Sequence, residues 1–210
     1  MNPANTPMAW PPHSIPSAYQ MRLLGTAAER TEAAALAEER QRWLTLRGLP
    51  VPIRVDVPAL FRDTQRGLAG LFEDDVLIAC MILQREPDLG WGADGSGPCL
   101  FLRHVHTLPG RSDDAIRLVT LWASDYAARL SLPHVRAEAL ARHALSADPI
   151  AGLLHRLRDM GWVLRGSGAG QDGERVARLE LAADLRPGLT ALIGCSVREP
   201  QPTTGSRSSS

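Results

Sequence analysis

Apolar segments of strand length alternate with segments of helical periodicity along residues 99–181, and this alternation constrains the fold more than any other feature. An apolar run at 99–107 precedes a segment whose apolar residues share one helical face: Ile116, Val119, Ala123, Tyr126 and Leu130. This spacing predicts a helix over 112–129. The pattern then predicts a strand at 132–139, a helix at 149–160 that Gly161 ends, and strands at 162–164 and 176–181.

The N-terminal half adds a strand, two helices and a hairpin to this order. The predicted elements are a strand at 18–24, helices at 26–47 and 58–66, and hairpin strands at 68–72 and 76–84. The complete order indicates a domain of the α+β or α/β class, in which helices flank a mixed, mostly antiparallel sheet. We expect residues 1–17 to be a disordered Pro-rich arm, residues 18–184 the folded domain, and residues 185–210 a low-complexity tail.

The composition excludes several enzyme classes. All 23 basic residues are Arg, and Asn occurs only at positions 2 and 5. A chain without Lys cannot hold a P-loop lysine, a pyridoxal Schiff base or a Ser–Lys dyad. Because no Asn follows position 5, a Cys-His-Asn triad within the predicted domain is excluded as well. Arg balances the 23 acidic residues, so the net charge of zero gives no reason to expect nucleic-acid or membrane-surface binding. The preference for Arg is typical of a GC-rich bacterial genome.

Metal binding and secretion are not indicated by the sequence. Cys80, Cys99 and Cys195 form no CxxC pair, so neither a disulfide framework nor a zinc site is expected, and we predict no metal. The N-terminal segment has no charged and apolar regions of a signal peptide, and no apolar window is long enough to span a membrane. We therefore expect a cytoplasmic protein.

The order of elements resembles that of the GNAT N-acetyltransferase superfamily over about residues 19–182. The segments that carry the resemblance are CLFLRHVHT, LPGRSDDA, IRLVTLWASDYAARL, PHVRAEA and IAGLLHRLRDMGW. In that family the loop and helix N-terminus after the fourth strand bind the pyrophosphate of acetyl-CoA, because free N–H groups and the helix dipole attract an anion. The resemblance implies acetyl-CoA as co-substrate, bound by Val105, His106, Thr107, Arg111, Ser112, Asp113, Asp114 and Ala115.

The sequence departs from the family pattern at two places. With Arg111 aligned to the first position of the family's phosphate loop, Asp114 and Ile116 stand where glycines are usual. Asp113 and Asp114 are expected to repel a pyrophosphate, which weakens coenzyme A binding. Leu157 stands where the family often has the Tyr that protonates the leaving thiolate.

Three residues are candidates for catalysis. His104 and His106 alternate with Leu102 along the predicted strand, so all three are expected on one face, where an imidazole could accept the proton of an amine. The alternative is that both are structural, hydrogen-bonded histidines. Glu138 on the next strand could act as general base through a water, or could pair with Arg136.

Four of the five tryptophans lie in the predicted domain, and their surroundings in the sequence predict two different roles. Trp43, Trp122 and Trp162 belong to apolar patterns and are predicted to be core residues. Trp91 lies in a Gly-rich loop, so we expect it to line a substrate pocket.

Two other functions are compatible with the sequence. Residues 150–182 also resemble the recognition helix and wing of a winged-helix regulator of the MarR kind, in which Arg156, Arg158, Arg165, Arg175 and Arg178 would contact DNA. A catalytically silent binding protein with the GNAT fold is the other alternative. The favoured function is transfer of an acetyl group from acetyl-CoA to an amine of a small molecule or peptide. We expect no membrane or nucleic-acid partner, and the protein could be a homodimer.

Overall fold

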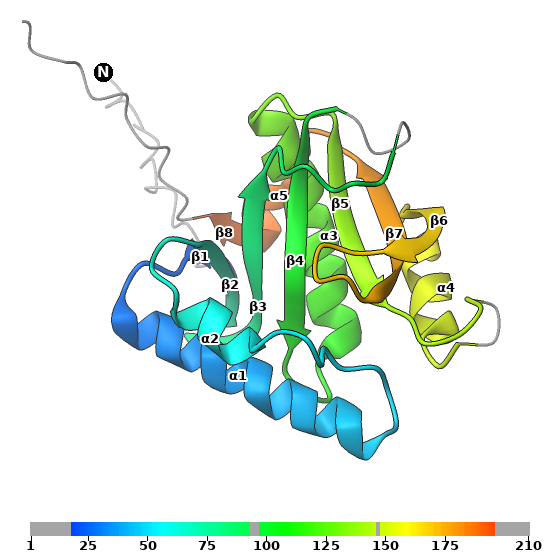
Figure 1. Ribbon diagram of the computed structural model, residues 1–210. Coiled ribbons are helices and arrows are strands. Elements are labelled where there is room, and N and C mark those ends of the chain that lie inside the picture. Colours follow the sequence, from blue (N-terminus) through cyan, green and yellow to red (C-terminus); the bar gives the residue numbers. More distant parts are fainter. Residues whose placement is uncertain (1–17, 93–96, 146–147, 196–210) are drawn as a thin grey trace, which may run out of the picture.

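Within the described residues, which are 18–92, 97–145 and 148–195, eight strands form one sheet (Figure 1). The strands are β1 (Tyr19–Leu23), β2 (Gly67–Glu73), β3 (Val76–Arg85), β4 (Cys99–Thr107), β5 (His134–Leu140), β6 (Val163–Ala169), β7 (Arg175–Ala182) and β8 (Ile193–Cys195). Their order across the sheet is β6-β7-β5-β4-β3-β2-β1-β8. Only the β4–β5 and β1–β8 pairs of this sheet are parallel, so the described sheet is mixed and mostly antiparallel, as the sequence predicts.

Two helices cover one face of the sheet. Helix α1 (Ala27–Leu46) begins at a capping box, in which Thr26 and Glu29 each accept a hydrogen bond from the other's main chain. Short helix α2 (Val57–Arg62) follows and contributes Phe61, which is fully buried. The buried residues of α1 end at Ala37, so its C-terminal half lies beyond the packed core.

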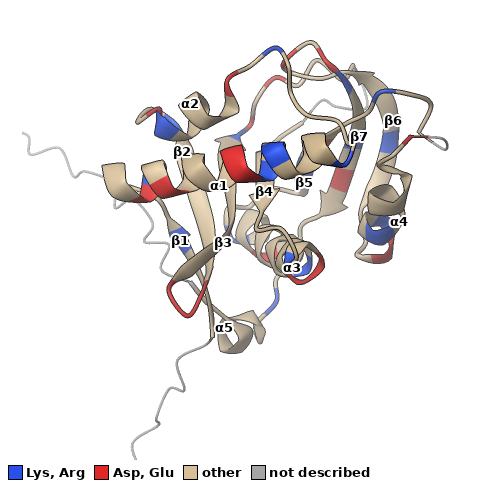
Figure 2. Ribbon diagram, turned by 90° about the horizontal axis from the view of Figure 1, so that it is seen from below, with Lys and Arg blue, Asp and Glu red and all other residues tan. Residues whose placement is uncertain are grey.

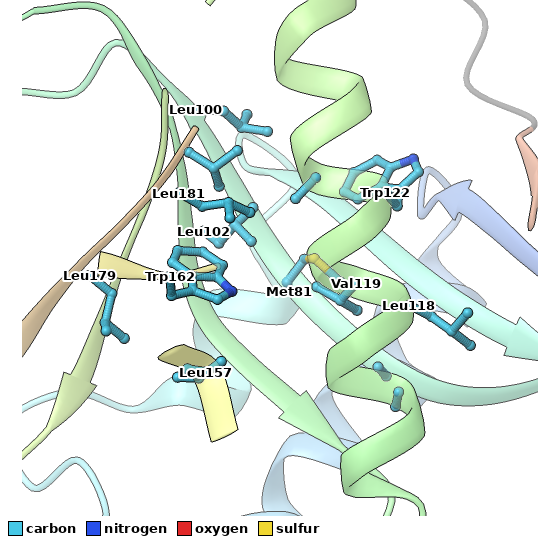
Figure 3. Packing of buried hydrophobic residues seen from close by; sticks show 14 of the residues in the cluster. Met81, Leu100, Leu102, Leu118, Val119, Trp122, Leu157, Trp162, Leu179 and Leu181 are labelled. Carbon is cyan, nitrogen blue, oxygen red and sulfur yellow. The ribbon is translucent and has the colours of Figure 1, made fainter. Parts of the chain in front are cut away.

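The opposite face of the sheet carries α3 (Ser112–Arg129), α4 (Ala151–Asp159) and the short α5 (Leu189–Leu192). Figure 3 shows how α3 packs on the sheet, with Val119 of α3 near Met81 of β3, and Trp122 of α3 belongs to the same buried cluster. Trp162 follows α4 and is also buried, and its Nε1 donates a hydrogen bond to Thr120 Oγ1 at 3.0 Å. The prediction that Trp122 and Trp162 are core residues is confirmed.

The C-terminal region differs from the expectation of a tail that starts at residue 185. Residues 189–195 form α5 and β8, and β8 pairs in parallel with β1 through Tyr19–Ile193, Gln20–Gly194 and Met21–Cys195. Leu189 and Ile193 are buried in the main core, which provides the physical reason for the difference. Residues 1–17 and the end of the chain after residue 195 lie outside the described residues.

The sheet also excludes the winged-helix alternative. In a wing, the hairpin after the helix would stand apart from the body, but here β7 pairs with β5 along its whole length, from His134–Ala182 to Leu140–Val176. The hairpin is therefore one edge of a large sheet. None of the helices in the described ranges is long and apolar enough to cross a membrane.

Candidate functional site

Strands β4 and β5 are paired along only part of their length. The parallel ladder runs from Cys99–His134 to Leu102–Ala137. Beyond that point β4 continues along β3, whereas β5 continues along β7. The two strands therefore part in the middle of the sheet, and main-chain groups of residues 103–107 on the β5 side are not used in the β4–β5 ladder.

A β-bulge in β4 lies at the point where the strands part. His104 has a positive φ of 51°, and the β3–β4 register shifts between the pairs Ile82–Arg103 and Cys80–His106. The extra residue in β4 reverses the alternation of its side chains. Leu102 therefore belongs to the core cluster under α3, whereas His106 lies opposite Cys80, on the face covered by α1 and α2. The expectation that Leu102, His104 and His106 share one face is wrong.

The parted strands open into a cavity of about 650 Å³. It is bordered by β4, β5, the C-terminal half of α1 with the loop after it, and the first turns of α3 and α4. All three predicted catalytic residues line it: His104, His106 and Glu138. The predicted coenzyme A contacts Val105, Thr107 and 111–114 line it too, but Ala115 is fully buried in the core cluster below α3 and is not part of the lining.

The N-terminus of α3 forms one wall of the cavity. No side chain caps its first turn, and Gly110 precedes it with a φ of 87°. The uncapped main-chain N–H groups and the helix dipole are therefore available to an anion at this end. Thr107 Oγ1 lies 3.0 Å from Ser112 Oγ, which ties the end of β4 to the start of the helix.

The charged side chains near this helix end are paired with one another. Arg111 forms an ion pair with Glu73 of β2, so its guanidinium does not point freely to a phosphate. Asp113 lies 3.2 Å from Arg156 Nε of α4. Figure 2 shows the acidic end of α3 beside the basic residues of α4. Because the Arg156–Asp113 pair is largely exposed, it is weak and can exchange for a ligand contact.

The two histidines form a stacked pair inside the cavity. Their ring centroids lie 6.4 Å apart with the planes within 7°, and Phe61 contacts His106 edge-on at 5.9 Å. Burial lowers the pKa of each imidazole to about 3, with smaller contributions from Arg103 at His104 and from the neighbouring His104 at His106. Both rings are therefore neutral at neutral pH, and neither has a strong tendency to accept a proton.

Glu138 is held by two hydrogen bonds and faces the same cavity. Trp91 Nε1 donates to Oε1 at 2.9 Å, and the main-chain N–H of Gln171 donates to Oε2 at 3.1 Å. Burial nevertheless raises the pKa of this carboxyl above its ordinary value. Arg136, the pairing partner that the sequence suggested, forms a buried ion pair with Glu180 at 2.9 Å.

The structure exchanges the roles that the sequence assigned to two tryptophans. Trp91 is only 7 % exposed and lies behind Glu138, where its indole N–H holds the carboxylate. Trp43, predicted to be a core residue, is half-buried and lines the cavity. Helical periodicity places Trp43 on the apolar face of α1. The buried residues of that face end at Ala37, so the helix has already left the core where Trp43 lies.

Sequence reasoning also missed two cavity residues. Asp172 of the β6–β7 loop forms an ion pair with Arg103, and its Oδ2 lies 3.4 Å from His104 Nε2. Arg40 of α1 also lines the cavity. Neither residue has a signal in the local sequence, because a hairpin loop and a long helix bring them to the site from distant parts of the chain.

Comparison with known proteins gives structural matches only. No family model matches the chain, and no curated protein sequence matches it. A GNAT-family acetyltransferase from Streptococcus agalactiae is similar with a TM-score of 0.54 and 16% identity, covering 78% of this chain and 95% of that one. FeeM, an N-acyl amino acid synthase from uncultured soil microbes, gives a TM-score of 0.55 at 12% identity, covering 79% and 91%.

A third similar structure is AAC(6')-Ib, solved in complex with paromomycin and acetyl-CoA. Its TM-score is 0.53 at 11% identity, and the match covers 79% of this chain and 94% of that one. The matches extend over nearly the whole of each solved chain. The chain therefore has the fold of the GNAT N-acetyltransferases, which confirms the fold that the order of elements predicts.

Proposed function

We propose that this protein is an N-acyltransferase that moves an acetyl group from acetyl-CoA to an amine of a small molecule or peptide. The observation that carries the proposal is the parting of β4 and β5 into a cavity that ends at the uncapped N-terminus of α3. Structures with this fold include AAC(6')-Ib in complex with paromomycin and acetyl-CoA.

The end of the cavity at α3 suits the pyrophosphate of coenzyme A. The N–H groups of residues 112–114 in the first turn would bind phosphate oxygens. Arg156 would add a cation once it leaves Asp113. The pantetheine arm would lie along β4, next to Val105, His106 and Thr107, whose main chain faces the opening between the strands.

In the proposed reaction the neutral amine nitrogen of the acceptor attacks the thioester carbonyl carbon, and the new C–N bond gives a tetrahedral intermediate. Main-chain N–H groups of β4 stabilise the oxyanion of this intermediate. The nitrogen of the intermediate loses one proton, the C–S bond breaks to give the amide, and coenzyme A leaves as the thiolate, which takes a proton from solvent. Glu138 accepts that proton, directly or through a water, because its raised pKa brings it closer to that of an effective base at neutral pH.

The neutral histidines have a different part in this proposal. With pKa values near 3, His104 and His106 shape the cavity and offer ring nitrogens for hydrogen bonds. Because an imidazole of such low pKa holds a proton poorly, Glu138 is the better candidate for the base.

The test has two measurements on the full chain. Isothermal titration calorimetry with acetyl-CoA measures binding, and thiol release in the presence of an amine panel measures transfer. Glu138→Gln should reduce kcat by about 10²–10⁴-fold while acetyl-CoA binding is kept, because it removes the base and one of the two hydrogen bonds that hold the carboxylate. Glu32→Gln, on the exposed side of α1, is the matched control and should change neither. No heat with acetyl-CoA at millimolar concentration would indicate instead a silent protein with this fold.

A further inference from the structure

Arg40 presents a half-buried cationic group to the cavity. It lines the cavity together with Trp43 and Leu44 of the same helix. Its guanidinium carbon lies 4.3 Å from the centroid of the Trp43 ring, and that of Arg47 lies 3.9 Å from the same ring. Two cations therefore flank one indole. The Nη1 atom of Arg40 is buried and has no hydrogen-bond partner in the described part of the chain.

The other arginines that line the cavity are already matched with carboxylates. Arg103 pairs with Asp172, Arg111 with Glu73 and Arg156 with Asp113. Arg40 forms no ion pair among residues 18–92, 97–145 and 148–195. A partly desolvated cation without a counter-ion is unfavourable, and partial burial together with Arg47 lowers the pKa of Arg40. The cavity wall at Arg40 therefore carries an unbalanced positive charge.

The surroundings of Arg40 add a second unused polar group and an apolar wall. His106 is 6 % exposed, and its Nε2 has no hydrogen-bond partner in the described ranges. Arg40 is one of the charges that lower the pKa of His106, which indicates that the two side chains are close. The apolar residues that line the cavity include Trp43, Leu44, Leu49, Pro50 and Pro52. A ligand that fits here has an anionic group and apolar surface.

We propose that Arg40 binds a carboxylate of the acceptor, so that the acceptor is a carboxylate-bearing apolar amine, of which an apolar amino acid is the simplest example. This inference rests on the proposed function, in which Glu138 accepts the proton from the acceptor's amine. The carboxylate pairs with the guanidinium of Arg40 and accepts a hydrogen bond from His106 when the Nε2 tautomer carries the proton. The side chain of the acceptor packs on Trp43 and the loop after α1.

Three probes separate the contributions of the carboxylate and of the amine to binding. L-phenylalanine carries both the amine and the carboxylate, phenethylamine lacks the carboxylate, and 3-phenylpropanoate lacks the amine. Binding of each to the full chain is measured by calorimetry, without acetyl-CoA and with it. We expect phenylalanine and phenylpropanoate to bind the unmodified protein at least about tenfold more tightly than phenethylamine.

Variants on α1 assign this preference to one residue. Arg40→Gln should abolish the preference for carboxylates, and Arg40→Lys should keep part of it because the charge remains. Arg42→Gln is the matched control, because Arg42 is exposed and pairs only weakly with Glu38 at 3.6 Å. It should bind all three probes as the unmodified protein does. Circular dichroism checks that each variant is folded. If Arg40→Gln does not fold, the proposal is tested by the binding of the three probes to the unmodified protein alone.

The possible failures of the two proposals are distinguishable. If phenethylamine binds as tightly as phenylalanine, if the preference persists in Arg40→Gln, or if no probe binds at about 5 mM, this inference is overturned even when acetyl-CoA binds and is consumed. If carboxylates bind through Arg40 but acetyl-CoA does not bind, the carboxylate site stands and the acyl-transfer proposal fails.

Discussion

Replacing His106 by Phe should make the protein less sensitive to acid. His106 is buried against Phe61 and its pKa is about 3 in the folded protein, whereas an unfolded His has a pKa of about 6.5. Between these values the unfolded chain binds more protons than the folded one. Stability contributed by the neutral ring is therefore complete above about pH 6.5 and is lost as the pH falls toward 3.

The magnitude follows from the linkage relation. At about pH 5 the unfolded His is mostly protonated and the folded one is not. For one ring this lowers the free energy of unfolding by about 2 kcal/mol relative to about pH 7.5. This loss of free energy depends almost entirely on the pKa in the unfolded chain, so any pKa below about 4 in the folded protein gives the same loss. For a chain of this length, about 2 kcal/mol corresponds to a melting temperature lower by about 4–8 °C.

The assay is urea unfolding of the unmodified protein and of His106→Phe, followed by Trp fluorescence at the two pH values. His106→Phe should lose about 2 kcal/mol less than the unmodified protein between about pH 7.5 and 5, with an unchanged m value. His155→Gln, on the exposed side of α4, is the control for removal of a surface histidine. Equal losses in the unmodified protein and in His106→Phe would refute the buried, neutral state of His106.

Two further predictions concern the phosphate end and the C-terminal strand. Asp113→Asn with Asp114→Asn should tighten acetyl-CoA binding several-fold at low salt, because repulsion is removed and Arg156 is released, and the gain should shrink as salt is added in calorimetry. An unchanged affinity would argue against a phosphate site at this helix end. Ile193→Ala should lower stability by about 2–5 kcal/mol in urea unfolding, because Ile193 is fully buried. A loss below about 0.5 kcal/mol would show that β8 does not contribute to the core.

The sequence predicts the elements of this fold well because their hydrophobic periods are long and uninterrupted. The helix at 112–129 and the strand at 99–107 have the predicted bounds. The last strand could not be predicted, since β8 has only three residues and owes its place to pairing with β1, at the other end of the chain. Local patterns do not report such distant pairing.

The candidate site could be predicted only in part, for a related reason. The sequence identified His104, His106 and Glu138, because polar residues inside apolar strands stand out. It could not give the bulge, since nothing in the local sequence marks His104 for a positive φ. Nor could it give the place of Trp43 and Arg40, because periodicity tells which face of α1 is apolar but not where the sheet beneath that face ends.

The bulge in β4 also determines how this strand tolerates changes in length. Residues before His104 and residues after it follow opposite rules for which side chains face α3 and which face α1. Deleting His104 would remove the extra residue and restore regular alternation, and His106 and Thr107 would keep their places opposite Cys80 and Ala79. The deletion would take one imidazole from the cavity and leave the faces of His106 and Thr107 unchanged. In β4, the loss of one residue is therefore absorbed at the bulge, whereas a second loss would turn the side chains that follow to the other face.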